Sequence, residues 1–194
     1  TVGLNILVGY TGQISLGHAG FFAIGAYGTV LLMTNLHFPF LLALICGGLI
    51  AAFFGFILGL PALRLEGPYL AIATLGFGMA ITQVIGRWKA FGGRMGLEVP
   101  DLSLGPYVID TDRQLYFVVV TIAFLLILAA RNLMKTRVGR AFIAIRDSDI
   151  AAETMGVNLT FYKTLAFAVS AFYAGVAGGL FAFLFAIRLI RNGQ

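Results

Sequence analysis

A stretch near the N-terminus, GYTGQISLGHAGFFAIGAY at Gly9–Tyr27, combines helix-breaking glycines with hydrogen-bonding side chains in an otherwise apolar context. Gln13, Ser15 and His18 offer donors and acceptors without formal charge, which suits a polar, uncharged or zwitterionic solute better than a metal ion. Backbone groups freed at membrane depth must be satisfied by protein or by a water-filled cavity. Two interpretations are open: these side chains border a solute path, or they only satisfy the backbone of a broken helix.

A second stretch, ATLGFGMAITQ at Ala73–Gln83, again combines glycines with hydroxyl and amide side chains. We predict a second glycine-interrupted crossing there, because paired interruptions of this kind mark the substrate path in membrane carriers. The candidate solute-path residues are Gln13, Ser15, His18 and Thr74.

The sequence contains no combination of side chains that suggests catalysis. It has neither a nucleophile with a positioned base nor a His or Cys cluster of metal-ligand spacing. A G-x-x-x-x-G-K-[ST] phosphate loop is also absent, so we expect ATP to be bound by a partner chain. The single cysteine, Cys46, excludes an intrachain disulfide. We assign no catalytic residue, metal or cofactor to this chain.

The surrounding composition is that of a membrane protein, since 60% of the 194 residues are apolar and 11% are charged. Thr1–Leu63 contains no charged residue at all. About 20 apolar residues cross the hydrocarbon core as a helix. We therefore predict an all-α fold, a polytopic transmembrane helical bundle of five to six segments with interrupted helices. The later charge-free stretches are Gly67–Gly86, Gln114–Ala130 and Thr164–Ile187.

The distribution of charge predicts the orientation of these segments. Residues 131–163 carry six basic and three acidic side chains, a net charge of +3, whereas four bases and four acids cancel in residues 87–113. Basic loops stay on the cytoplasmic side of a membrane. We therefore predict that residues 131–163 and 62–67 are cytoplasmic, and that residues 35–40 and 87–113 lie outside. This asymmetry explains the net charge of +5, which is no sign of nucleic-acid binding.

Small residues recur every four positions in two of the predicted crossings. Such a row gives a helix a face that a neighbouring helix can approach closely. We predict that both rows mark close packing; the alternative is that these faces slide during a transport cycle. The rows are Gly47, Ala51, Gly55 and Gly59, and Ser170, Ala174, Gly178 and Ala182, the latter flanked by Ala171, Gly175 and Gly179.

The predicted cytoplasmic loop contains KTRVGRAFIAIRDSDIAAETMGVN at Lys135–Asn158, which divides into two short helices. Ser148 is the expected N-cap of the second helix, and Gly156 ends it. Apolar and basic residues together form a mixed surface that suits a protein groove. We favour a protein partner over anionic lipid, because the small alanines of this loop insert poorly into a bilayer. The apolar positions are Phe142, Ile145, Ala152 and Met155.

Four blocks of sequence carry a family resemblance. They are GLNILVGYTGQISLGHAGFFAIGAY, LRLEGPYLAIATLGFG, FGGRMGL, and TRVGRAFIAIRDSDIAAETMGVN with the following FAVSAFYAGVAGGLFA. In this order they closely resemble the permease subunits of branched-chain amino-acid ABC importers of the LivM type. The resemblance implies a single transmembrane domain over residues 1–194, part of a longer permease, that forms the path for branched-chain or related amino acids in the bacterial cytoplasmic (inner) membrane.

The resemblance also implies partners and a coupling segment. The expected partners are a second, LivH-like permease, two cytoplasmic ATPase subunits that bind ATP and Mg²⁺, an extracytoplasmic solute-binding protein, and membrane lipid. Arg94 either meets that binding protein or belongs to a solvated turn. The resemblance implies that Arg137–Gly156 is the coupling segment that sits in a cleft of the ATPase; its motif reads GRAFIAIRDSD here, without the usual opening Glu. Its candidate residues are Arg137, Gly139, Arg140, Ala141, Ala144, Arg146, Asp147, Ala152 and Gly156.

A free-standing secondary carrier or channel for a small polar solute such as urea is the alternative function. Such proteins usually place an ionisable residue inside a crossing to couple ions. Here the predicted crossings contain only His18. The sequence therefore favours the importer subunit.

Cysteine labelling of Ser148→Cys in intact cells tests the predicted orientation. Because residue 148 lies in the loop of net charge +3, we expect an impermeant reagent to reach it only after the membrane is opened. Modification from the outside of intact cells would contradict this topology.

Overall fold

The computed structural model describes residues 1–62, 65, 67–87, 103–104, 107–108 and 112–192. Arg94 and its neighbours lie outside the described residues. Within the described part of the chain, five helices are long and apolar enough to cross a membrane, which confirms the all-α polytopic bundle. These helices are His18–Leu36 (α2), Phe40–Ala62 (α3), Pro68–Arg87 (α4), Asp112–Lys135 (α5) and Leu159–Asn192 (α8).

Shorter elements complete the description. The chain begins with Val2–Leu4 (α1), which continues into a π-helix over Asn5–Tyr10 (η1). The loop between α5 and α8 forms two helices, Arg137–Asp147 (α6) and Asp149–Thr154 (α7), as predicted. Two antiparallel strands of two residues each, Ser103–Leu104 (β1) and Tyr107–Val108 (β2), pair with each other. These strands were not predicted.

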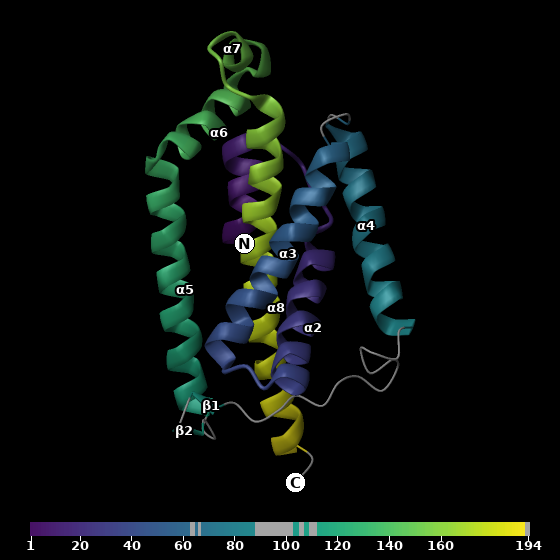
Figure 1. Ribbon diagram of the computed structural model, residues 1–194, viewed down its shortest axis with the longest axis vertical. Helices are drawn as coiled ribbons and strands as arrows, with labels where there is room; N and C mark the ends of the chain where they lie inside the picture. Colours follow the sequence, from purple (N-terminus) through teal and green to yellow (C-terminus); the bar gives the residue numbers. More distant parts are fainter. Residues whose placement is uncertain (63–64, 66, 88–102, 105–106, 109–111, 193–194) are drawn as a thin grey trace.

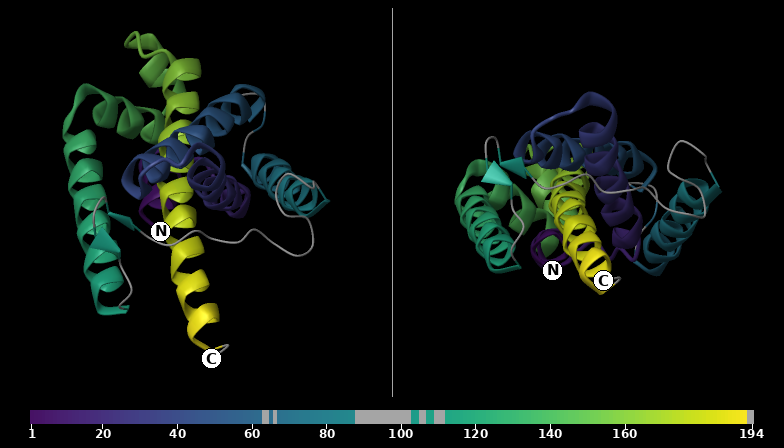
Figure 2. Two further views of the ribbon diagram at one scale, coloured as in Figure 1. Left: turned by 60° about the horizontal axis from the view of Figure 1, so that its bottom comes forward. Right: turned by 90° about the horizontal axis from the view of Figure 1, so that it is seen from below.

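The long helices surround α8, the longest element of the bundle (Figure 1). Helices α2 and α3 pack on α8 along much of their length, while α4 and α5 stand on opposite sides of this centre (Figures 1 and 2). Helices α6 and α7 lie at the same end of the molecule as the last turn of α3 and the first turn of α4, and the α2–α3 turn lies at the other end. This arrangement is compatible with the predicted order of loops; which end faces the cytoplasm stays a prediction.

Close backbone contacts hold α2, α3 and α8 together. A Cβ atom added to Gly25 of α2 would overlap the backbone of Gly175 in α8. One added to Gly55 of α3 would lie 2.5 Å from the Cβ of Ala171. One added to Gly178 would overlap the carbonyl oxygen of Phe22. Both rows of small residues are therefore confirmed as faces of close helix packing.

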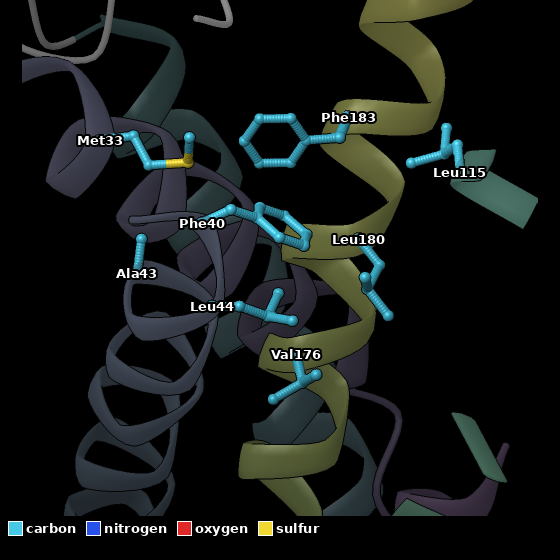
Figure 3. Close-up of a cluster of buried hydrophobic side chains, with 8 residues drawn as sticks. All are labelled: Met33, Phe40, Ala43, Leu44, Leu115, Val176, Leu180 and Phe183. Atoms are coloured by element: carbon cyan, nitrogen blue, oxygen red, sulfur yellow. The ribbon is translucent and has the colours of Figure 1, made fainter. Parts of the chain in front are cut away.

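An apolar cluster joins the α2–α3 turn to α8 at the end of the bundle opposite α7 (Figures 1 and 3). The rings of Phe40 and Phe183 meet nearly edge to face, with centroids 4.9 Å apart and an interplanar angle of 80°. The turn itself uses His37 in a left-handed conformation, with φ of 52°, as the C-cap of α2. The buried members of this cluster are Met33, Phe40, Ala43, Leu44, Leu115, Val176, Leu180 and Phe183.

The predicted interruption at Ala73–Gln83 was wrong, because α4 is a continuous helix through this stretch. One of its glycines, Gly78, serves packing: a Cβ on Gly20 of α2 would lie 3.0 Å from the Cα of Gly78. The hydroxyl groups of Thr74 and Thr82 donate to carbonyls three or four residues earlier in the same helix. Glycine and threonine in an apolar segment are thus accommodated without a break when the neighbouring helix comes close.

We expect Gly25→Ala to lower the free energy of unfolding by about 1–3 kcal/mol, because backbone atoms of Gly175 cannot rotate away from the new methyl group. Unfolding of the purified chain in detergent measures this. Gly76→Ala in α4 is the matched control, since a Cβ there meets no described atom within 4 Å. The control should be neutral or more stable by up to about 1 kcal/mol. Equal losses in the two variants would contradict the close-contact interpretation.

Candidate solute path and coupling loop

The first predicted interruption is present between η1 and α2. Gly12 has a φ of +70°, a conformation that side chains with a Cβ rarely adopt, and residues 12–16 are not helical. Helix α2 begins at His18. The interruption is shorter than the glycine pattern suggests, because Gly9 lies within η1 and Gly20 within α2.

Side chains around the break satisfy its backbone. The Thr11 hydroxyl donates to the Leu7 carbonyl (2.5 Å) and accepts from the Gln13 amide (3.1 Å). The backbone N–H of Gly17 donates to the Ser15 hydroxyl (3.4 Å). The Gly17 N–H and the Thr11 hydroxyl thereby have partners in an apolar surrounding, where an unsatisfied polar group is costly.

Thr74 connects the break to α4. Its hydroxyl accepts a hydrogen bond from the backbone N–H of Leu16 (3.0 Å) and donates to the carbonyl of Ala71 (3.0 Å). A Cβ on Gly17 would overlap the Thr74 carbonyl, so the two backbones are in direct contact. Ser15 and Thr74 are both buried, at 3% and 1% exposure.

His18 faces a different set of elements, α1 and α8. Its Nε2 lies 2.6 Å from the Ser170 hydroxyl, which donates its proton to the carbonyl of Gly3 (2.6 Å). Because a serine hydroxyl has one proton, it must accept from Nε2–H of His18. This assigns the tautomer and leaves Nδ1 as an acceptor, which is buried and has no hydrogen-bond partner within the described residues.

A cavity of about 530 Å³ borders His18, between α1, α2, α5 and α8. Apart from Thr1, His18 and Tyr173, its lining residues are apolar or glycine. The Tyr173 hydroxyl closes one side by donating to the carbonyl of Leu126 in α5 (3.0 Å). Of the four candidate solute-path residues, only His18 lines this cavity, while Ser15 and Thr74 bind backbone at the break. Their role in a solute path stays a prediction.

The α6–α7 loop has the caps that the sequence predicts. The Ser148 hydroxyl accepts from the backbone N–H of Ala151 (3.3 Å) and thereby caps α7. Gly156 follows the helix with a φ of +83°. An ion pair between Asp149 and Lys163, 2.5 Å apart, fixes α7 to the start of α8. The loop is therefore a folded unit.

The predicted mixed surface of this loop needs a correction. Phe142 and Ile145 are buried because the apolar face of α6 packs inwards, and Ala152 of α7 is buried within the loop. Phe142 belongs to a cluster with Ile6, Leu7 and Phe167 of the transmembrane region. Met155 alone of the four predicted apolar positions is exposed, at 87%, and the sequence analysis missed Ile150, which is 78% exposed. The sequence did contain a signal for Ile150, because an apolar residue stands there in the first turn of a solvent-facing helix.

The candidate coupling residues divide into an inner and an outer group. Gly139 and Ala141 are buried with Ala152, and a Cβ on Gly139 would overlap the backbone of Met134. Gly139 therefore lets α6 fold back tightly on the end of α5. Ala144 is half-buried. The exposed members are Arg137, Arg140, Arg146, Asp147 and Gly156.

These features define an integral membrane protein of the polytopic α-helical class: the helical spans, the break whose backbone groups are hydrogen-bonded, and the folded loop. Residues 1–193 match the family described as branched-chain amino acid transport system, permease component. The chain belongs to this family of membrane permease components.

Curated relatives agree with this assignment. The chain is 36% identical to the high-affinity branched-chain amino acid transport system permease proteins LivM of Salmonella typhimurium and of Escherichia coli, over 93% of its own length. It is 27% identical, over 77% of its length, to a probable permease of the same name from Methanocaldococcus jannaschii. The alignments cover 48%, 48% and 44% of these proteins, so the chain spans about half the length of the relatives it matches. No solved structure matches the chain significantly.

We expect Thr74→Val to destabilise the break. The variant keeps the shape of the side chain but removes the acceptor of the Leu16 N–H, and an unsatisfied buried donor costs about 1–3 kcal/mol. Faster hydrogen exchange at Leu16 and Gly17 and a lower midpoint of unfolding measure the effect. Thr82→Val in the same helix is the control, because its hydroxyl only donates to carbonyls of α4. Unchanged exchange in Thr74→Val would contradict this role.

Proposed function

We propose that this chain forms part of the membrane-spanning permease subunit of an ABC importer for branched-chain or related amino acids, located in the cytoplasmic membrane. The observation that carries the proposal is the folded α6–α7 loop. Phe142 anchors this loop to the bundle, and the apolar side chains of Ile150 and Met155 are exposed on its outer surface. The family match and the names of the relatives support the solute class.

In this proposal the loop is the contact with a cytoplasmic ATPase. Ile150 and Met155 stand on α7 and just after it, and Arg140 is exposed on α6. Exposed apolar residues beside polar ones mark protein contact surfaces. Among the candidate coupling residues Ala152 is buried within the loop itself, so the proposed ATPase contact extends instead to Ile150 and Met155.

The proposal also includes the other subunits of the importer. Two ATPase subunits bind ATP and Mg²⁺, a second LivH-like permease completes the membrane part, and an extracytoplasmic binding protein delivers the solute. The solute path runs beside the break of Gln13, Ser15 and Thr74 and beside His18, whose neighbouring cavity offers apolar walls to an aliphatic side chain. The family match does not favour the alternative of a free-standing carrier or channel.

Uptake of labelled leucine into vesicles that hold the full importer and internal ATP tests the function. The wild type should accumulate leucine only with ATP. Ile150→Asp and Met155→Asp should release the ATPase subunits and lower uptake at least about tenfold, because a carboxylate in a desolvated apolar contact is strongly unfavourable.

Leu36→Asp is the matched control. It places the same change at an exposed leucine at the opposite end of the bundle and should keep the ATPase subunits bound. Full uptake together with full ATPase retention in both loop variants would place the docking surface elsewhere. Uptake without ATP would favour the carrier.

A further inference from the structure

We propose that Arg146 acts inwards, as a positioning residue that ties the α6–α7 loop to the break between η1 and α2. Through this tie a displacement of the loop reaches the break and, beyond it, α4. The inference rests on the proposed function in one respect: the ATPase is what displaces the loop.

The guanidinium of Arg146 is held between two partners. Its Nε and Nη2 donate to the Asp147 carboxylate at 3.3 and 3.1 Å, and its Nη1 donates to the carbonyl of Gly9 at 3.1 Å. The adjacent carboxylate fixes one edge of the planar group, which directs the remaining nitrogen towards η1. The bond to Gly9 joins residues that are 137 positions apart in the chain.

The Gly9 carbonyl lies in the last turn of η1, where the carbonyls carry partial negative charge and favour a cation. Neighbouring carbonyls accept from the chain itself, since Gly12 N–H donates to Val8 and Gln13 N–H donates to Leu7. Arg146 thus adds a partner from a distant element to the end of this helix. Gly12, with its positive φ, lies directly against Arg146, because a Cβ on Gly12 would be 3.4 Å from the arginine Cγ.

An apolar contact reinforces the same junction. Phe142, one turn before Arg146 on α6, is fully buried in the cluster that includes Ile6 and Leu7 of η1. Helices α6 and η1 therefore share a hydrophobic contact and a charged hydrogen bond. Because the two contacts are of different kinds, we expect them to resist both separation and rotation of α6 and η1.

The far side of the break is attached to α4. The backbone N–H of Leu16 donates to Thr74, and Gly17 packs on the Thr74 carbonyl. Among the described elements, α4 packs extensively only on α2, and it stands on the side of the bundle opposite α5 (Figures 1 and 2). A continuous series of contacts therefore runs from α6 through Arg146, the break and Thr74 to α4.

Such a series of contacts becomes coupling only if a change at one end alters the other, so the test measures coupling directly. The full importer is prepared with Arg146→Gln and, as the matched control, Arg131→Gln, an exposed arginine of α5 that is not among the candidate coupling residues. Hydrogen exchange of residues 9–17, retention of the ATPase subunits and leucine uptake per ATP hydrolysed are measured in parallel.

In Arg146→Gln we expect exchange of residues 9–17 to rise about tenfold, the ATPase subunits to stay bound, and uptake per ATP to fall. Arg146→Lys should behave similarly, because an ammonium group cannot reproduce the planar fork that bridges Asp147 and Gly9. Arg131→Gln should leave the exchange of residues 9–17 unchanged. Unchanged exchange in Arg146→Gln would overturn the tie.

A double-mutant cycle with Thr74→Val tests the continuation to α4. If the break carries the coupling, the double variant Arg146→Gln/Thr74→Val should transport no worse per ATP than the poorer single variant. Losses that multiply would overturn the continuation. The exchange measurement does not depend on the ATPase or on the solute, so a failure of the proposed function is distinguishable from a failure of the tie.

Discussion

The backbones of α2 and α8 touch where Gly25 meets Gly175, and much of the remaining structure depends on this contact. In a bilayer, helices gain no hydrophobic energy from leaving lipid, so their association relies on close packing and hydrogen bonds. Gly175 also faces Ala51 of α3, and α3 meets α8 again where Gly55 lies against Ala171. The contact between α2 and α8 also lets Ser170 of α8 reach both His18 and the carbonyl of Gly3, which holds the start of the chain against the bundle.

The break beside this core illustrates how irregular backbone survives in an apolar surrounding. Thr11, Ser15 and Thr74 each supply a hydroxyl to a backbone group of the break or of the helix before it. The two interpretations of the polar residues near the N-terminus are therefore compatible. Ser15 and Thr74 satisfy backbone and are buried, whereas Gln13 and His18 are only half-buried, and His18 borders a cavity.

The α6–α7 loop has an inner face that is attached to the bundle and an outer face that no described residue covers. Phe142 and Ile145 are buried against or beside the bundle, and Arg146 bonds to η1. Ile150 and Met155 are directed outwards. A loop with this division is suited to pass a displacement from a partner to the bundle, because its inner face is attached there.

The sequence by itself determined the membrane-spanning helices, the first break, the close-packing faces of α3 and α8, and the capped helices of the loop. These features follow from composition, small-residue spacing and capping residues, which act over a few positions of the chain. Only the tertiary structure decided that α4 is continuous, because Gly78 serves the approach of α2 and Thr74 serves the backbone of a distant break. It also decided which face of α6 is buried. An amphipathic helix shows in its sequence that one side is apolar, but whether that side meets the bundle or a partner depends on contacts such as Phe142 with Leu7 and Arg146 with Gly9, far apart in the chain.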